Sequence, residues 1–227
     1  MSYHFDFSFL TQYWPDLLRG TWLTLRMTVL SIVPGFVGGT LCALARIYGR
    51  RWMARTAQTY VEVIRNTPLV IQVFWVFFGL AALHVRIPAV TAAVIALVIN
   101  VSAYTAEIMR AGFEAIPKGQ LEAASCLALT KRQTIWYVEL PQAVERVYPA
   151  LVSQFILMML ATSIMSQISA DELTGVADVI QSFTYRGFEA YLSVAVIYLV
   201  IVSALRVVLL AGASIPFPRL RVQNRQL

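Results

Sequence analysis

The chain has 227 residues, of which 59% are apolar and 13% are charged. A soluble domain is about half apolar and about a quarter charged, so this composition predicts an all-α, polytopic membrane protein. The net charge of +6 could suit nucleic acid, but the arginines lie beside apolar spans and form no basic stripe, which excludes that partner. The separated cysteines and histidines show no metal-ligand spacing, so we expect no metal site.

The N-terminal part predicts an interfacial segment followed by a membrane span. Residues 1–19 alternate aromatic and polar side chains, which is typical of a segment lying at the membrane interface. The first span is expected from about Thr21 to Ile47, since a bilayer core needs roughly 20 apolar residues. Pro34 and its neighbouring glycines favour either a bent helix at a moving interface or plain close packing. Arginines after this span mark the cytoplasmic side, so we expect an external N-terminus.

The second and third spans contain polar residues that lipid-facing helices would lack. The second span is expected from about Gln58 to Leu83, with a break at Pro68 because proline lacks the helical N–H donor. Gln72 follows one turn later and either lines a solute pathway or hydrogen-bonds a neighbouring helix. The third span is expected from about Ile87 to Met109, with polar residues in its second half.

Glu107 has two interpretations. An acid inside a span is a functional candidate, because burying an unpaired charge is expensive. Alternatively, Glu107 lies near the inner interface and pairs with Arg110, three residues later on the same helix face. The residues expected along the translocation pathway are Thr67, Pro68, Gln72, Asn100, Ser102, Glu107, Thr162 and Ser163.

Residues 115–142 form the longest segment of mixed polarity and predict a short helix, a break and a second short helix. Thr130 and Gln133 have the spacing of a capping box. Pro141 is expected to end the second helix and to bias Leu140 toward an extended backbone. The sequence therefore predicts a charged helical hairpin on the cytoplasmic surface, placed to contact a partner.

The remainder of the chain predicts two more spans. They are expected from about Val147 to Ile168 and from Ala190 to Ala213, separated by an acidic, external short helix within 171–186. Five transmembrane helices place the termini on opposite sides, with residues 213–227 as a basic cytoplasmic tail. We expect one transmembrane domain over 20–212.

No pattern in the chain supports catalysis. A phosphate-binding GxxxxGK[ST] motif is absent, as is a plausible Ser–His–Asp or Cys–His set. We therefore expect a protein that is not an enzyme and that takes its energy from a partner. A secondary transporter is the alternative, although it would need midspan ionisable residues or inverted repeats. A non-transporting membrane scaffold is a second alternative.

Several motifs together resemble one family. GQLEAA at 119–124 and ELPQA at 139–143 resemble the EAA loop of the membrane subunits of binding-protein-dependent ABC importers. AYTAEIMRAGFEAIPKGQ and RNTPLVIQ narrow the resemblance to the polar amino-acid branch, which includes the histidine and glutamine permeases. The residues that the resemblance assigns to the coupling loop are Gly119, Gln120, Glu122, Ala123, Ala124, Ala128, Leu140 and Pro141. Among them, Ala128 departs from the family pattern.

The resemblance implies a type I importer fold in the bacterial inner membrane. The 115–142 hairpin would be the coupling-helix loop that docks into an ABC ATPase dimer, and ATP and Mg would bind that partner, so this chain would need no cofactor of its own. A second permease, either another copy or a paralogue, and a periplasmic solute-binding protein would complete the importer. An importer for a different small solute stays an alternative, and histidine, arginine, glutamine, glutamate and opines all stay open as solutes.

Two departures from the family pattern carry expectations. Ala128 replaces a glycine at which the hairpin helix ends in a left-handed turn, which costs on the order of 1 kcal/mol and predicts a less sharp break. Leu160 and Ala161 stand where the family often has Lys-Asp. We hypothesise that this chain supplies a more apolar half of the binding site and that a charged paralogue completes it.

Overall fold

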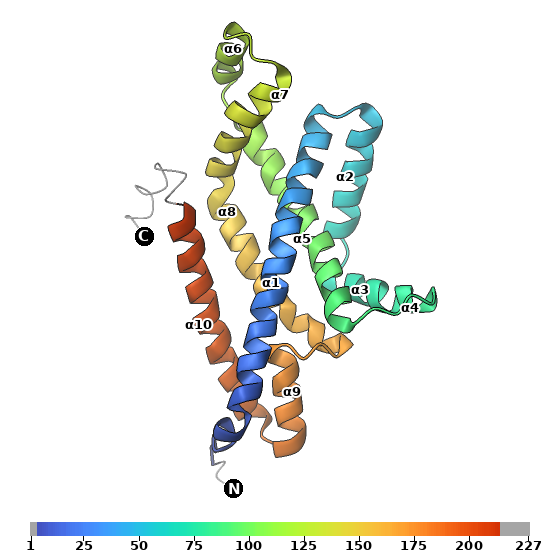
Figure 1. Ribbon diagram of the computed structural model, residues 1–227, viewed down its shortest axis with the longest axis vertical. Helices are drawn as coiled ribbons and strands as arrows, with labels where there is room; N and C mark the ends of the chain where they lie inside the picture. The colour runs from blue at the N-terminus through green and yellow to red at the C-terminus, as the bar shows by residue number, and fades with distance from the viewer. Residues whose placement is uncertain (1–3, 214–227) are drawn as a thin grey trace.

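The computed structural model describes residues 4–213, and these residues fold entirely into helices and their connections (Figure 1). Four helices are long and apolar enough to cross a membrane, and a bent helix pair makes a fifth span if it is counted as one. The all-α, polytopic expectation is therefore confirmed, with four to five spans. The expected tail lies outside the described residues from 214 onward.

Helix α1 runs without interruption from Phe9 to Tyr48 and passes through Pro15 and Pro34. It begins at Phe9, well before the start expected near Thr21, so most of residues 1–19 are helical. The reason is packing, because Phe9 and Leu17 are buried against α9 (Leu173–Thr184) and α10 (Gly187–Ala213).

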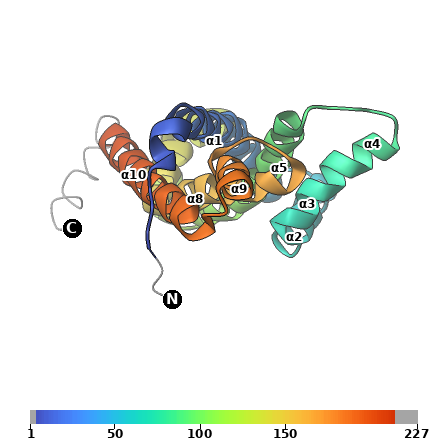
Figure 2. The ribbon, with the colours of Figure 1, turned by 90° about the horizontal axis from the view of Figure 1, so that it is seen from below.

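The second span is broken at Pro68, as predicted. Helix α2 (Arg51–Arg65) and the helical stretch from α3 (Leu69–Phe74) through a π-helical turn (Trp75–Gly79) to α4 (Leu80–Ala82) meet at 108°. Viewed from below, α2 to α4 lie on one flank and α10 on the other, with α1, α5, α8 and α9 between them (Figure 2).

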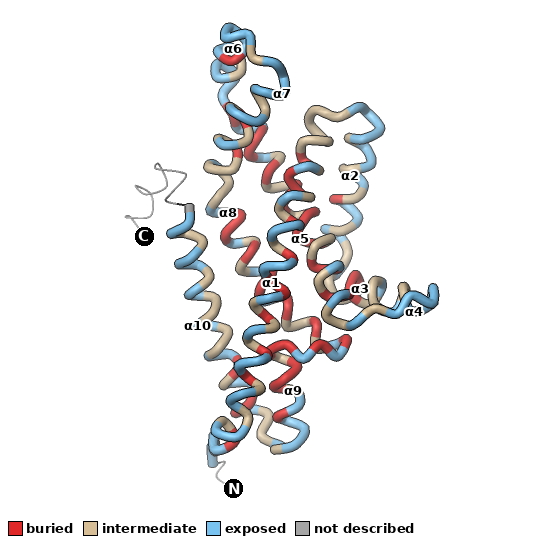
Figure 3. Tube along the Cα trace, in the orientation of Figure 1, coloured by how far each residue is buried: buried red, intermediate tan, exposed pale blue. Residues whose placement is uncertain are grey.

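Helix α5 (Ala89–Glu114) is the centre of the fold and packs against α1, α2 and α8. Its buried face is rich in alanine, which allows neighbouring helices to approach closely. Figure 3 shows this buried stripe, in contrast to α10, whose surface is largely uncovered. In α1, Gly39 faces α5 so closely that an added Cβ would lie 2.6 Å from the backbone oxygen of Ser102.

The hairpin differs from its prediction at its second helix. Helix α6 (Lys118–Cys126) is followed by a turn, by α7 (Lys131–Gln133), by a π-helical turn (Thr134–Glu139) and by α8 (Leu140–Ala161). The capping box of Thr130 and Gln133 is confirmed.

Pro141 does not end the helix, which corrects the expectation drawn from it. Leu140 is helical, with φ −60° and ψ −47°, and one helical span continues from Lys131 to Ile168 through a final 3-10 turn (Thr162–Ile168). The physical reason lies in the preceding π-helical turn. A wider turn accommodates a residue that cannot donate the regular i to i−4 hydrogen bond.

The break after α6 is sharp, which corrects the expectation that Ala128 would make it less sharp. Ala128 adopts the left-handed conformation, with φ 54°. Its N–H donates to the Ser125 carbonyl at 2.9 Å, and the Leu129 N–H donates to the Ala124 carbonyl at 3.2 Å. These two bonds form a Schellman motif, in which carbonyl groups at the end of α6 accept hydrogen bonds from the turn that follows. The bonds stabilise the left-handed turn although Ala128, and not glycine, occupies it.

Replacing Ala128 with glycine is expected to stabilise the permease by about 1 kcal/mol, because glycine adopts the left-handed conformation without the Cβ penalty. Ala128 is exposed, so no packing is lost. Thermal unfolding of the purified permease in detergent measures the change. Ala123→Gly, inside the same helix, is the matched control and should destabilise by a similar amount. A lower unfolding midpoint for Ala128→Gly would contradict the expectation.

The opposite end of the molecule is built around α9, which confirms a short helix within the acidic segment. Glu172 caps this helix, and its carboxylate accepts hydrogen bonds at 2.9 Å from the N–H groups of Thr174 and Gly175. The hydroxyl of Tyr198 in α10 donates to the same carboxylate at 2.8 Å. The hydrogen bond from Tyr198 therefore links α10 to the cap of α9. Burial raises the pKa of Glu172.

Candidate translocation site and coupling surface

A polar cavity of about 480 Å³ lies where the broken second span meets α5 and α8. The break contributes Arg65 to Leu69, because Pro68 turns the chain there and exposes its polar residues. Helix α5 contributes Asn100 and Tyr104. Helix α8 contributes Gln154, Leu157, Met158 and Ala161. Thr67, Pro68 and Asn100, which the sequence placed on the pathway, are therefore brought together at one cavity.

Gln72 lies behind this cavity and holds the break in shape. Its amide nitrogen donates to the carbonyl oxygens of Ile64 at 2.8 Å and of Thr67 at 2.9 Å. Its amide oxygen accepts from Asn100 Nδ2 at 3.1 Å. The side chain thus satisfies carbonyl groups near the break and joins α3 to α5, which is the neighbouring-helix interpretation of this residue.

The other expected pathway residues do not border the cavity. The Ser102 hydroxyl hydrogen-bonds the hydroxyl of Tyr60 in α2 and the Ile99 carbonyl. Thr162 is fully buried and donates to the Met159 carbonyl at 2.6 Å, and Ser163 donates to its own helix.

Glu107 is the centre of an ion-pair network just beyond the cavity. Its carboxylate accepts from Arg46 of α1 at 2.6 Å and from Arg110 at 3.0 Å, so the expected pair with Arg110 is present. Arg110 also binds Glu114 at 2.6 Å. Arg65 lies 3.8 Å from Glu107 and 5.4 Å from the centre of the Tyr104 ring. The network therefore joins α1, α2 and α5.

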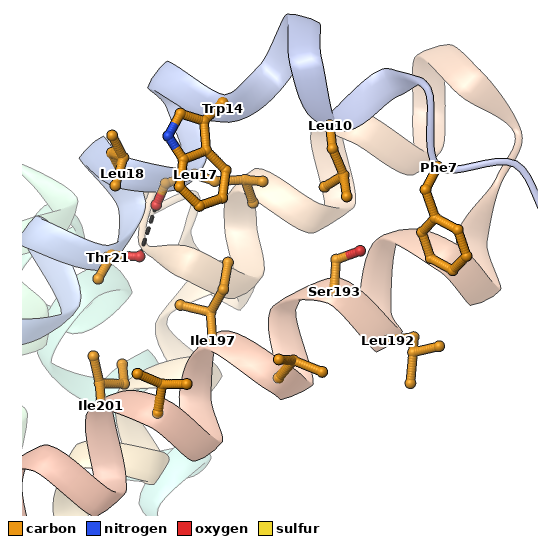
Figure 4. A pocket seen from close by; sticks show the side chains of 12 residues that line it. Phe7, Leu10, Trp14, Leu17, Leu18, Thr21, Leu192, Ser193, Ile197 and Ile201 are labelled. Carbon is orange, nitrogen blue, oxygen red and sulfur yellow. Dashed lines mark hydrogen bonds between the residues drawn. The ribbon is translucent and has the colours of Figure 1, made fainter.

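A second, larger hollow of about 620 Å³ runs between the first turns of α1 and α10 (Figure 4). Its lining is almost entirely apolar. The two hydroxyl groups it contains are already used, because Thr21 donates to the Leu17 carbonyl at 2.7 Å and Ser193 donates to the Glu189 carbonyl at 2.8 Å. Apart from these hydroxyls, the indole N–H of Trp14 is the one polar side-chain group among the described residues that line this groove. The 480 Å³ cavity, which several polar side chains border, is therefore the better candidate for a polar solute.

The hairpin presents its motif residues to the outside. Gly119, Gln120, Glu122, Ala123, Ala128 and Pro141 are exposed, Leu140 is half-buried, and Ala124 is buried against the rest of the loop. Gly119 and Ala123 share one face of α6 at four-residue spacing, and Leu127, which caps the helix, follows four residues later. An added Cβ at Gly119 would meet nothing within 4 Å. Small residues on this face permit close approach by a partner.

Contacts from α1 and α8 fix the hairpin on the spans. The hydroxyl of Tyr48 donates to the buried carboxylate of Glu139, and Lys131 lies 5.0 Å from the centre of the Tyr48 ring. Gln142 donates to Gln120 at 3.0 Å, which joins the two arms of the hairpin. The end of α1 is therefore linked directly to the loop.

Several residues of these two sites were not among the predicted ones. Arg65, Tyr104 and Gln154 border the cavity, and exposed Leu127 and Tyr137, at 75% and 77%, enlarge the apolar surface of the hairpin. Arg65 directly precedes the Asn-Thr-Pro break, so its position next to predicted pathway residues could have identified it as part of the site. No sequence periodicity identifies Tyr104 or Gln154, because their positions depend on helix crossing.

Comparisons with known proteins agree with this architecture. Residues 35–222 match the model of the family described as binding-protein-dependent transport system inner membrane component. The chain is 39% identical over 208 residues to the glutamine transport system permease protein GlnP of Escherichia coli (strain K12), covering 90% of this chain and 94% of that protein. It is 34% identical over 206 residues to the octopine transport system permease protein OccM of Rhizobium radiobacter, covering 87% and 84%.

A solved structure gives the same result. The chain resembles the crystal structure of an amino acid ABC transporter with histidines, with a TM-score of 0.83 and 40% identity over 91% of this chain and 97% of that one. In this family ATP is bound and hydrolysed by a separate ATPase subunit, and the permease carries no cofactor. The chain thus belongs to the family of inner-membrane permease subunits of binding-protein-dependent ABC importers.

Proposed function

We propose that this permease carries a polar amino acid or an amino-acid derivative such as an opine through the 480 Å³ cavity. The observation that supports the proposal most strongly is the gathering of Asn66, Thr67, Asn100 and Gln154 around one cavity in a largely apolar protein. Small-molecule sites are of this size and orient their ligands with a few polar groups. Relatives named for glutamine, octopine and L-cystine transport support the same solute class.

The pathway residues have different roles in this proposal. Thr67, Pro68 and Asn100 contact the solute, whereas Gln72, Ser102 and Glu107 hold the surrounding helices in register. Thr162 and Ser163 lie in the 3-10 turn that follows the α8 wall of the cavity, and their hydroxyls bond within that turn. The solute crosses by alternating access, in which partner binding shifts the permease between two conformations.

A transport system of this family works with an ATPase and a solute-binding protein. We propose in addition that the hairpin docks on an ATPase dimer and that a second permease, either another copy or a paralogue, completes the pathway in the lipid bilayer. The exposed stripe of Gly119, Ala123 and Leu127 supports the docking. The second permease is supported by the open cavity, which the residues of this chain line but do not enclose.

We also propose a periplasmic N-terminus and a cytoplasmic hairpin and C-terminus, with the transmembrane domain over 20–212. Arginines gather at the α1–α2 end of the molecule, which Figure 1 shows on the same side as α6, whereas α9 lies at the other end. Basic residues favour the cytoplasmic side.

Cys126, which is exposed in the hairpin, tests orientation and docking together. In a Cys42→Ser background, a membrane-impermeant maleimide is expected to label Cys126 in inside-out vesicles and not in intact spheroplasts. The bound ATPase is expected to reduce this labelling, because it would cover α6. Labelling from the periplasmic side would contradict the proposed orientation, and equal labelling with and without the ATPase would contradict the docking.

The solute class is tested by uptake into proteoliposomes that contain the assembled importer. ATP-dependent, binding-protein-dependent accumulation of radiolabelled glutamine, glutamate, histidine, arginine, L-cystine or octopine is the expected result. Failure to accumulate any of them, while the complex still hydrolyses ATP, would contradict the amino-acid proposal.

A further inference from the structure

We infer that Arg65 binds the carboxylate of the solute and that the cavity therefore selects neutral or acidic amino acids over cationic ones. This inference rests on the proposed function of the cavity and names its ligand more closely. Among the residues that border the cavity, Arg65 is the one charged side chain, and no carboxylate is present. The remaining polar neighbours are amides and hydroxyls, which cannot neutralise a cationic side chain.

The charge balance of the Glu107 ion-pair network leaves Arg65 available to bind the carboxylate of a solute. The guanidinium groups of Arg46, Arg65 and Arg110 face the carboxylates of Glu107 and Glu114, so one positive charge is in excess. Glu107 is hydrogen-bonded by Arg46 and Arg110, but its distance to Arg65 is 3.8 Å, beyond a hydrogen bond. Arg65 is therefore the member of this network with the weakest contact to a carboxylate.

Geometry also distinguishes Arg65 from the other two arginines. Its side chain is 40% exposed, against 16% for Arg46 and 29% for Arg110. Within residues 4–213 it forms no hydrogen bond, while its contact with the Tyr104 ring orients it at the cavity wall. A guanidinium group with unused N–H donors suits bidentate binding of a planar carboxylate.

The consequence for selectivity is electrostatic. A bound solute whose carboxylate meets Arg65 neutralises the excess charge, and a neutral side chain adds no new one. A second positive charge, as in arginine, would lie in a cavity whose lining supplies no carboxylate, and charges in such a site are poorly screened.

The test measures binding to the permease–ATPase complex in nanodiscs by saturation-transfer NMR, without the binding protein, which would impose its own selectivity. The probes are L-glutamine, L-arginine and L-glutamine α-amide, in which the carboxylate is replaced by an uncharged amide. The wild type is expected to bind L-glutamine at least about tenfold more tightly than the α-amide, as expected for loss of a charge-assisted hydrogen bond. L-Arginine should bind more weakly than L-glutamine.

In Arg65→Gln the ratio between L-glutamine and its α-amide is expected to fall to about one, and Arg65→Lys should restore part of it. Arg51→Gln removes a positive charge from the other end of α2, away from the cavity, and should leave the ratio unchanged. A structural role for Arg65 would weaken all probes together without changing their ratio.

Ala161→Asp provides an independent variant, because Ala161 borders the same cavity. The new carboxylate is expected to improve L-arginine binding relative to L-glutamine by about tenfold. If Arg65→Gln left the affinity ratio of L-glutamine to its α-amide unchanged, or if the wild type preferred L-arginine, this inference would be overturned and the proposed function would stand. Absence of binding by every probe, together with absence of uptake, would overturn the proposed function.

Discussion

Replacement of Glu122 with alanine is expected to lower ATP-driven uptake by at least about tenfold while the permease stays folded and inserted. Glu122 is exposed on α6, and its carboxylate forms no hydrogen bond or ion pair within the described residues, so its removal costs the isolated chain little. In the proposed complex its carboxylate is a charged acceptor for the ATPase, and loss of one charge-assisted hydrogen bond weakens such a contact by about 1.5–3 kcal/mol.

The measurement is uptake by proteoliposomes, with ATPase co-purification and thermal unfolding of the permease recorded on the same preparation. Asp171→Asn is the matched control, because it removes an exposed carboxylate at the α9 end of the molecule. It should retain ATPase binding. Normal uptake in Glu122→Ala would contradict the assignment of α6 as the coupling element. Reduced uptake with a lower unfolding midpoint would show that the residue stabilises the fold instead.

Replacement of Gly39 with alanine is expected to destabilise the permease by about 1–3 kcal/mol, the usual cost of overpacking a close contact. The new Cβ would lie 2.6 Å from the Ser102 carbonyl oxygen and 2.6 Å from the Cβ of Thr105. Backbone atoms cannot rotate away, so α1 and α5 must separate. The thermal midpoint of the purified chain should fall, by about 2–4 °C for each kcal/mol at this chain length.

The adjacent Gly38 is a stringent control. An added Cβ there would lie 3.5 Å from the Cβ of Ser102, which is an ordinary contact. Gly38→Ala should therefore be neutral, or stabilising by up to about 1 kcal/mol, because alanine favours the helix. Equal effects of the two substitutions would show that helix propensity, and not the close α1–α5 crossing, determines stability here.

Some expectations failed where nearby residues outweighed a local preference. Pro141 favours a helix end, yet the π-helical turn before it allows the helix to continue into α8. Ala128 disfavours a left-handed turn, yet the two hydrogen bonds of the Schellman motif hold it there. The first span was expected to begin near Thr21, but contacts with α9 and α10, which are distant in sequence, extend α1 back to Phe9.

The sequence by itself determined the helical class, the approximate spans, the break at Pro68, the capping box and the exposed hairpin. These features depend on composition and on residues within about one helical turn, so local patterns are sufficient. The tertiary structure alone decided which polar residues meet. Helix crossing placed Arg65, Asn100 and Gln154 around one cavity. It left Ser102 and Gln72 outside the lining, where they hydrogen-bond neighbouring helices. No local pattern encodes that outcome, because it depends on how α2, α5 and α8 pack against one another.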